Sequence, residues 1–316
     1  MGSGSDPGDG VCNGEDNARR RFGSMTGRLG NEAHLRGAGE THPEIGRVTV
    51  IEPAKGWCRV DLRELWSYRE LLGVLVMRDI KVRYKQTSLG VLWVVLQPLA
   101  STVIFTLIFG KLAKIPSEGY PYTLFVYSAL LPWTYFANAV SSCGNSLVGS
   151  AGLIGKTYFP RIIIPIAAVG AGLVDFAVSA AVLLLLLAAF GVGWSANLLA
   201  APFLVGAVVF TALGTGILLS ALVVSYRDFR NVIPFLLQIW LYTTPIIYPT
   251  GLIPERWQWV LYANPMAGLV EGFRSVFLDK PFDPAALGAS FAGAILLFLA
   301  GVLYFEKVER SFADII

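Results

Sequence analysis

The sequence contains few of the residues that enzymatic and metal sites usually need. Among 316 residues there are 3 cysteines and 2 histidines, and His34 and His42 both lie in a polar amino-terminal segment. Cys12, Cys58 and Cys143 have no paired spacing, so we expect neither a disulfide nor a metal site. The apolar stretches also lack a clustered pair of carboxylates. This disfavours a membrane glycosyl or phosphoryl transferase that works by general acid–base catalysis.

Charge is absent from five long stretches of the chain. Only 15% of the residues are charged, whereas 54% are hydrophobic and the mean hydropathy is +0.59. About 20 apolar residues are enough to cross the ~30 Å hydrocarbon core of a bilayer. This composition therefore excludes a soluble enzyme, a nucleic-acid binder and a disordered scaffold, and it predicts an all-α membrane protein. The uncharged stretches are 86–110, 119–155, 176–226, 231–254 and 284–305.

We divide the apolar part of the chain into six transmembrane helices. The uncharged stretch at 176–226 is too long for one crossing, and Gly191, Gly193 and Pro202 mark a turn within it. Basic residues are retained on the cytoplasmic side, and ten of them flank the span ends that we assign there, against five outside. Both termini are therefore expected in the cytoplasm. The predicted spans are 88–110, 122–145, 163–189, 199–223, 232–249 and 285–305.

Two segments precede the first predicted span. Residues 1–60 contain 12 glycines, and their eight basic residues balance eight acidic ones, which is typical of a disordered cytoplasmic tail. We expect no cleavable signal peptide, because this segment has no apolar run. The transmembrane domain then occupies 61–316. At its start, apolar residues recur at helical spacing over 61–79, which predicts an amphipathic helix lying in the cytoplasmic interface.

Asp175 is the only acidic residue near the middle of a predicted span. A charge at that depth costs about 2.5–3.5 kcal/mol even on the insertion scale, so the side chain should face protein or water. One interpretation is a polar translocation path or a proton relay. The other is a packing contact with a polar side chain of another helix. Loss of transport in Asp175→Asn would favour the first interpretation.

Aromatic residues are concentrated toward the outer half of the predicted spans. They can form an interfacial belt, or their rings and polar edges can line a path for a sugar. The loop at 250–284 mixes prolines and glycines with apolar residues, which predicts short broken helices that re-enter the outer leaflet and form an external gate. The alternative is an amphipathic surface loop. Besides Asp175, the candidate path or gate residues are Trp133, Tyr135, Phe136, Trp240, Tyr242, Tyr248, Trp257 and Trp259.

Two predicted cytoplasmic turns, 149–161 and 225–231, combine charges with aromatic residues that we expect to be exposed. Short turns of this composition suit docking to a soluble partner, although each can also be a plain topology signal. The segment 150–157 is similar to a phosphate-binding loop, but it begins with serine and follows a predicted span instead of a strand, so we expect no nucleotide there. The candidate docking residues are Lys156, Tyr158, Phe159, Arg161, Tyr226, Arg227, Asp228 and Arg230.

Six motifs follow one another along the chain. They are Met77-Arg-Asp-Ile-Lys-Val-Arg-Tyr-Lys-Gln-Thr-Ser-Leu-Gly-Val-Leu-Trp-Val-Val-Leu-Gln97-Pro98, Leu130-Leu-Pro-Trp133, Lys156-Thr-Tyr-Phe-Pro-Arg161, Tyr226-Arg-Asp-Phe229, Thr244-Pro245-Ile-Ile-Tyr248-Pro249 and Asn264-Pro265-Met-Ala-Gly-Leu-Val-Glu-Gly-Phe-Arg274. Each is weak alone, but the ordered set resembles the membrane subunits of type-2 ABC exporters of polysaccharides, O-antigens and teichoic acids. The resemblance covers about 61–316. It departs at the amino-terminal tail and at Gly155, where a bulkier polar or basic residue is expected.

The resemblance implies a homodimer of six-span subunits that pairs with two copies of a separate cytoplasmic ABC ATPase. The interfacial helix and the two docking turns would contact that ATPase, and 250–275 would form the external gate. ATP and magnesium would then bind to the ATPase, with no cofactor in this chain. The chain is therefore expected in the bacterial cytoplasmic (inner) membrane, as a transport subunit and not as an enzyme.

The functional hypothesis is a permease subunit of an ATP-driven exporter that carries a lipid-linked polysaccharide, such as O-antigen or teichoic acid, to the cell exterior. Lys81, Arg83 and Lys85 would steer a pyrophosphate headgroup toward a lateral opening, unless their role is topology alone. One rival is an ABC exporter of drugs or hydrophobic small molecules. Another is an ion-coupled carrier that uses Asp175, for which we find no internal inverted repeat. No nucleic-acid partner is expected.

Overall fold

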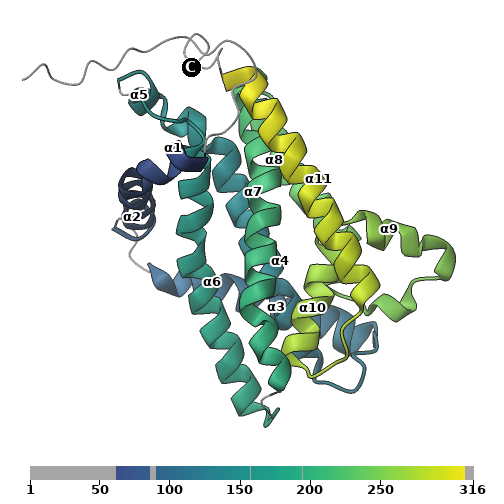
Figure 1. The fold of residues 1–316 in the computed structure, drawn as a ribbon. Coiled ribbons are helices and arrows are strands. Elements are labelled where there is room, and N and C mark those ends of the chain that lie inside the picture. The colour runs from purple at the N-terminus through teal and green to yellow at the C-terminus, as the bar shows by residue number, and fades with distance from the viewer. Residues whose placement is uncertain (1–61, 86–89, 157, 194, 310–316) are drawn as a thin grey trace, which may run out of the picture. The chain divides into compact units, whose positions relative to one another are not determined.

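The computed structural model describes residues 62–85, 90–156, 158–193 and 195–309, and all regular elements within these ranges are helical (Figure 1). The predicted tail at 1–60 lies outside the described residues. The elements are α1 (Leu62–Ser67), α2 (Arg69–Lys85), α3 (Val91–Phe105), the π-helix η1 (Thr106–Leu112), α4 (Tyr122–Gly149), α5 (Ala151–Ile154), α6 (Ile163–Ala189), the 3₁₀-helix η2 (Ala196–Ala200), α7 (Ala201–Ser225), α8 (Phe229–Thr243), the 3₁₀-helices η3 (Thr250–Leu252) and η4 (Glu255–Trp257), α9 (Gln258–Ala263), α10 (Ala267–Phe277) and α11 (Pro284–Glu309).

Four helical segments of the described residues are long and apolar enough to cross a membrane. They correspond to the first, third, fourth and sixth predicted spans. The segment for the first predicted span runs through α3 into η1, and the segment for the fourth predicted span joins η2 to α7 without a break. Six crossings therefore remain a prediction. The four segments are Leu92–Leu112, Ile163–Ala189, Ala196–Ser225 and Pro284–Glu309.

The other two predicted spans differ from this pattern for separate reasons. Helix α4 has 28 residues, which gives a length of about 42 Å, but its tyrosines, Trp133 and asparagines make it less apolar. It forms the centre of the main core, where Phe125, Tyr127 and Phe136 are fully buried. Helix α8 has only 15 residues and ends before the predicted boundary at 249. Because Thr244 precedes a proline it is extended, with ψ 136°, and the helix cannot continue.

Helices α7 and α11 pack closely because small residues face each other. A Cβ added at Gly214 would lie 2.6 Å from the backbone nitrogen of Phe298, and one added at Gly301 would lie 2.5 Å from the carbonyl oxygen of Gly214. Side chains at these positions would push the two backbones apart. Small residues permit this close approach, as is common for helix pairs in membranes.

Helices are present where the interfacial helix was predicted, but they have different ends. The segment is divided at Tyr68 into α1 and α2, and α2 continues to Lys85 instead of ending near 79. The exposed residues of α2 include the apolar Val74, Met77 and Val82. Leu75 of α2 is buried in a second core cluster, together with Ile163 of α6, Val224 of α7 and Phe305 of α11. This cluster holds α2 against the ends of the long helices.

Candidate functional site

A cavity of about 370 Å³ lies between α2, α3, α4 and α6. Its wall combines aromatic and aliphatic side chains with hydroxyl, amide and charged groups. It brings Arg83 of the predicted steering cluster together with Asp175 and Tyr135 of the predicted path. The lining residues are Arg83, Tyr84, Gly90, Trp93, Val94, Gln97, Pro98, Leu131, Thr134, Tyr135, Asn138, Ser141, Ser142, Gly172, Asp175, Phe176 and Ser179.

Asp175 is held by two groups from the end of α2. The guanidinium of Arg83 forms an ion pair with one carboxylate oxygen, and the hydroxyl of Tyr84 donates a hydrogen bond to the other. Arg83 also donates to Ser142 Oγ on α4 at 3.4 Å. Burial, followed by the hydrogen bond to Asp175, raises the pKa of Tyr84 to about 12, so this donor stays protonated at physiological pH. The contact of Asp175 with another helix matches the packing interpretation, although the carboxylate also lines the cavity.

Three of the predicted path aromatics form a compact cluster. The ring of Trp240 on α8 lies 5.0 Å from that of Phe136 and 6.4 Å from that of Trp133, between centroids. Trp133 and Phe136 are buried in the main core, and neither lines the cavity. Their role in this structure is core packing, which differs from the predicted lining of an open path. Trp240 Nε1 donates to Asn264 Oδ1 at 2.7 Å and so joins α8 to the junction between α9 and α10.

The other predicted path aromatics have mixed environments. Tyr135 is buried at the cavity wall, and its hydroxyl donates to the carbonyl oxygen of Val169 at 3.2 Å. Tyr242, Trp257 and Trp259 are exposed. Tyr248 is partly buried and donates from its hydroxyl to the carbonyl of Tyr242 at 3.3 Å. The structure thus places the predicted path residues in several separate regions.

The predicted re-entrant segment consists of short broken helices, as expected. Two 3₁₀-helices and α9 precede α10, which is buried along most of its length. Asn264 joins these pieces: its Nδ2 donates to Thr244 Oγ1 at 2.9 Å, and its Oδ1 accepts from the backbone nitrogen of Met266 at 3.0 Å. The segment is therefore tied to the residues that follow α8.

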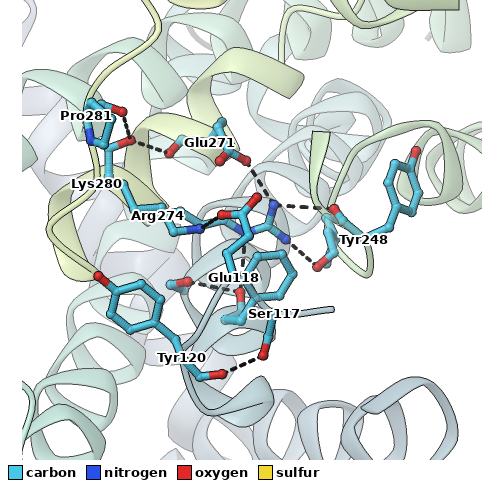
Figure 2. A network of polar contacts seen from close by, with 12 residues as sticks. Ser117, Glu118, Tyr120, Tyr248, Glu271, Arg274, Lys280 and Pro281 are labelled. Atoms are coloured by element: carbon cyan, nitrogen blue, oxygen red, sulfur yellow. Dashed lines mark hydrogen bonds and ion pairs between the residues drawn. The ribbon is translucent and has the colours of Figure 1, made fainter. Parts of the chain in front are cut away.

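Arg274 of α10 is fully buried and connects three parts of this region (Figure 2). Its guanidinium pairs with Glu271 at 2.9 Å and donates to the carbonyl oxygen of Ile246 at 2.7 Å. Longer contacts reach the carbonyl oxygens of Phe125 at 3.4 Å and Tyr248 at 3.5 Å. The guanidinium carbon lies 3.7 Å from the centroid of the Phe125 ring, which adds a cation–π contact. Arg274 thus links α10 to α4 and to the segment after α8.

A second ion pair lies beside this network. Lys280 pairs with Glu118, and its ammonium lies 5.1 Å from the centroid of the Phe125 ring (Figure 2). Ser117 Oγ donates to the carbonyl oxygen of Tyr120 at 2.5 Å and shapes the loop that carries Glu118. These contacts fix the loop before α4 to the loop that follows α10.

The two predicted docking turns lie at the same end of the helices. Tyr158 and Tyr226 are 75% and 60% exposed, which agrees with the predicted exposure. Phe159 was expected to be exposed, and this was wrong: its ring is buried in the second core cluster. Arg161 donates from its backbone nitrogen and its guanidinium to Glu309, so it ties this turn to the end of α11. Lys156, Arg227, Asp228 and Arg230 are exposed.

Comparison with known proteins identifies the family. A profile described as "ABC-2 type transporter" matches residues 70–278. The chain belongs to this family. The O-antigen export system permease protein RfbA of Klebsiella pneumoniae is 30% identical over 253 residues, which cover 78% of this chain and 95% of that protein. RfbA of Myxococcus xanthus is 30% identical over 256 residues, covering 80% and 98%, respectively. The polysialic acid transport protein KpsM of Escherichia coli is 26% identical over 206 residues, covering 62% and 77%.

This ABC-2 permease is a multi-pass membrane protein, and the resemblance inferred from its motifs is confirmed. Arg274 was named from the sequence only as the last residue of the sixth motif and was not predicted as a site residue. Its signal was Glu271 three residues earlier in an otherwise apolar helix, because residues three apart share a helix face. Asn264 was likewise named only as the first residue of that motif, because its partners Trp240 and Thr244 lie in other segments and cannot be inferred from spacing.

Proposed function

We propose that the chain is the membrane permease of an ATP-driven exporter that moves a lipid-linked polysaccharide from the cytoplasm to the cell exterior. One observation carries this proposal, namely the similarity to O-antigen export permeases over 95% of the length of such a relative. The polysialic acid transport protein points to the same broad class of cargo. As a homodimer, two copies of the chain would enclose the path.

ATP would be hydrolysed on a separate cytoplasmic ATPase. The segment 150–157 supports this division, because α5 follows the long helix α4 and a phosphate-binding loop needs a strand before it. The exposed rings of Tyr158 and Tyr226, with the charged residues beside them, form a surface suited to a soluble partner. Movement of the two turns would be transmitted through α4, α6 and α7, because these helices adjoin the turns and move as rigid elements.

The contacts in the opposite region support a gate. Arg274 and Asn264 hold the broken helices of 250–277 against α4 and the end of α8. A rearrangement of the long helices would therefore move this segment directly. The ion-coupled carrier is less well supported, because Asp175 is already neutralised by Arg83.

The test is gene disruption in the source organism, followed by complementation. Disruption should remove the surface polysaccharide and leave lipid-linked glycan inside the cell. The double variant Tyr158→Ala/Tyr226→Ala should fail to restore export and should lose copurification with the ATPase at an unchanged membrane level. Phe190→Ala removes an exposed ring at the far end of α6 and should restore export fully.

The opposite outcomes would overturn the proposal. Normal surface polysaccharide in the disrupted strain would exclude this cargo, and increased drug sensitivity there would favour an exporter of small molecules. Transport by the purified chain in vesicles without any ATPase would favour an ion-coupled carrier.

A further inference from the structure

The cavity between α2, α3, α4 and α6 carries charged, amide and hydroxyl groups on a mainly apolar wall, and it lies against membrane-spanning candidates. Asp175 is near the middle of α6, and Gln97 belongs to the segment Leu92–Leu112. Polar groups at membrane depth are costly unless protein, water or a polar ligand satisfies them. The cavity also falls within the ~300–1,000 Å³ that small-ligand sites usually have. Its contents should therefore be polar.

The charge of the cavity is balanced. Among the described residues, its lining contains one cation, Arg83, and one carboxylate, Asp175, and these two are already paired with each other. Lys81 and Lys85, the other members of the predicted steering cluster, do not line it. An anionic group such as phosphate would have to displace Asp175 from Arg83 or lie beside an unneutralised carboxylate. This balance favours an uncharged ligand.

The remaining lining combines two kinds of surface. Thr134, Asn138 and Ser141 of α4 present hydroxyl and amide groups along one helix, at spacings of four and three residues. Aromatic rings from Trp93 of α3 and Phe176 of α6 also line the cavity. Apolar ring faces together with hydrogen-bonding groups of both polarities match a sugar ring, which has C–H faces and a hydroxyl rim.

The cavity is accessible at its α3 side. The side chain of Trp93 is 54% exposed, and Asn138 is also exposed. Helix α3 belongs to a candidate span of which only 11% is buried within the chain. A group carried by a lipid can therefore approach this side without separating packed helices.

We propose that this cavity is a glycosyl-binding site that takes an uncharged sugar residue carried on a lipid. The inference rests on the proposed export function and deepens it, because it assigns the recognition of the cargo to the sugar and not to a phosphate. Arg83 and Tyr84 keep Asp175 in place as a hydrogen-bond acceptor for the sugar hydroxyls. Asp175 is thereby both a packing residue and a part of the site.

Thiol protection in vesicles tests the proposal without ATP, ATPase or transport. The reporter is Ser141→Cys in the full chain, with Cys12 and Cys58 replaced by serine; Cys143 is fully buried and stays. The matched control is Ser146→Cys, on the same helix and similarly half-buried but outside the cavity. Each protein is placed in phosphatidylcholine vesicles that contain an equal minor fraction of monoglucosyl diacylglycerol, phosphatidic acid or diacylglycerol.

The glucosyl lipid should slow maleimide labelling of Ser141→Cys, by roughly tenfold if the site is nine-tenths occupied. Neither phosphatidic acid nor diacylglycerol should do so, and labelling of Ser146→Cys should be equal in all three vesicles. Asn138→Leu, which fills an exposed position of the lining, should abolish the protection.

Three results would overturn the proposal. Stronger protection by phosphatidic acid would make the cavity an anion site, equal protection by all three lipids would make it an acyl-chain groove, and equal labelling rates throughout would leave it filled with water. None of these results bears on whether the chain exports a polysaccharide. The proposed export function is tested separately: normal surface polysaccharide in the disrupted strain would exclude it, whatever the labelling shows.

Discussion

Removing the positive charge of Arg274 should strongly destabilise the permease. In Arg274→Met, Glu271 loses its ion-pair partner and the carbonyl oxygen of Ile246 loses its closest side-chain donor. Hydrogen bonds to charged groups contribute about 1.5–3 kcal/mol each, so these two contacts give ~3–6 kcal/mol. Breaking a buried ion pair by removing one partner typically costs about 3–5 kcal/mol, which agrees. The contacts at 3.4 Å and 3.5 Å are too long to add much.

Thermal unfolding of the purified permease in detergent measures the effect. For a chain of this size, ~3–5 kcal/mol corresponds to a fall in Tm of about 6–20 °C. Glu271→Gln in the Arg274→Met background removes the unpaired carboxylate and should recover part of the loss. Lys280→Gln is the control, because its pair with Glu118 is partly exposed and should contribute no more than about 1 kcal/mol.

The reasoning would be refuted by either of two results. One is an Arg274→Met protein whose Tm lies within the small shift of the Lys280→Gln control. The other is a second substitution, Glu271→Gln, that lowers stability further instead of restoring it. In either case the buried guanidinium would not be what holds α10 to the rest of the helices.

Three further predictions concern other contacts. Gly214→Ala should lower the free energy of unfolding by about 1–3 kcal/mol, and with it Tm, because its Cβ would overlap the backbone of α11. The control is Gly206→Ala on the same helix, whose Cβ meets nothing within 4 Å and which should be neutral or stabilising. Asp175→Asn should lower Tm by leaving Arg83 without its ion-pair partner, and adding Arg83→Gln should restore part of it; an additive loss would contradict the pairing. Trp240→Phe removes a side-chain hydrogen bond of 2.7 Å and should lower the free energy of unfolding by about 1 kcal/mol. If both thermal unfolding and export were unchanged, this bond would not hold a gate element in place.

Periodicity and composition were sufficient to locate most helices. The predicted spans at 163–189 and 285–305 lie close to α6 and α11, because a long apolar run without charge has few alternatives to a helix in a bilayer. The broken helices after α8 also followed from local signals, since prolines at 249, 254 and 265 prevent one continuous helix. The end of α8 was misplaced because apolarity continues to 249, whereas the backbone is already extended at Thr244.

Side-chain environments were predicted less well. Phe159 follows the exposed Tyr158 in a short turn and was expected to be exposed, but it belongs to a buried cluster with Leu75 of α2, Val224 of α7 and Phe305 of α11. Nothing near Phe159 in the sequence signals those distant partners. For Asp175, the sequence established that a partner must exist but left its identity open, and Arg83 and Tyr84 are more than 90 residues away along the chain.

The sequence by itself determined the all-helical membrane class, the positions of the main spans and the family, because hydrophobic length and ordered motifs are local properties of the chain. Tertiary structure alone decided which charges are paired, which rings are buried, and that Arg83, Asp175 and the polar face of α4 surround one cavity. The physical reason is that ion pairs and cavities depend on the packing of several helices. One sequence pattern therefore permits several sets of partners, and only the folded chain selects among them.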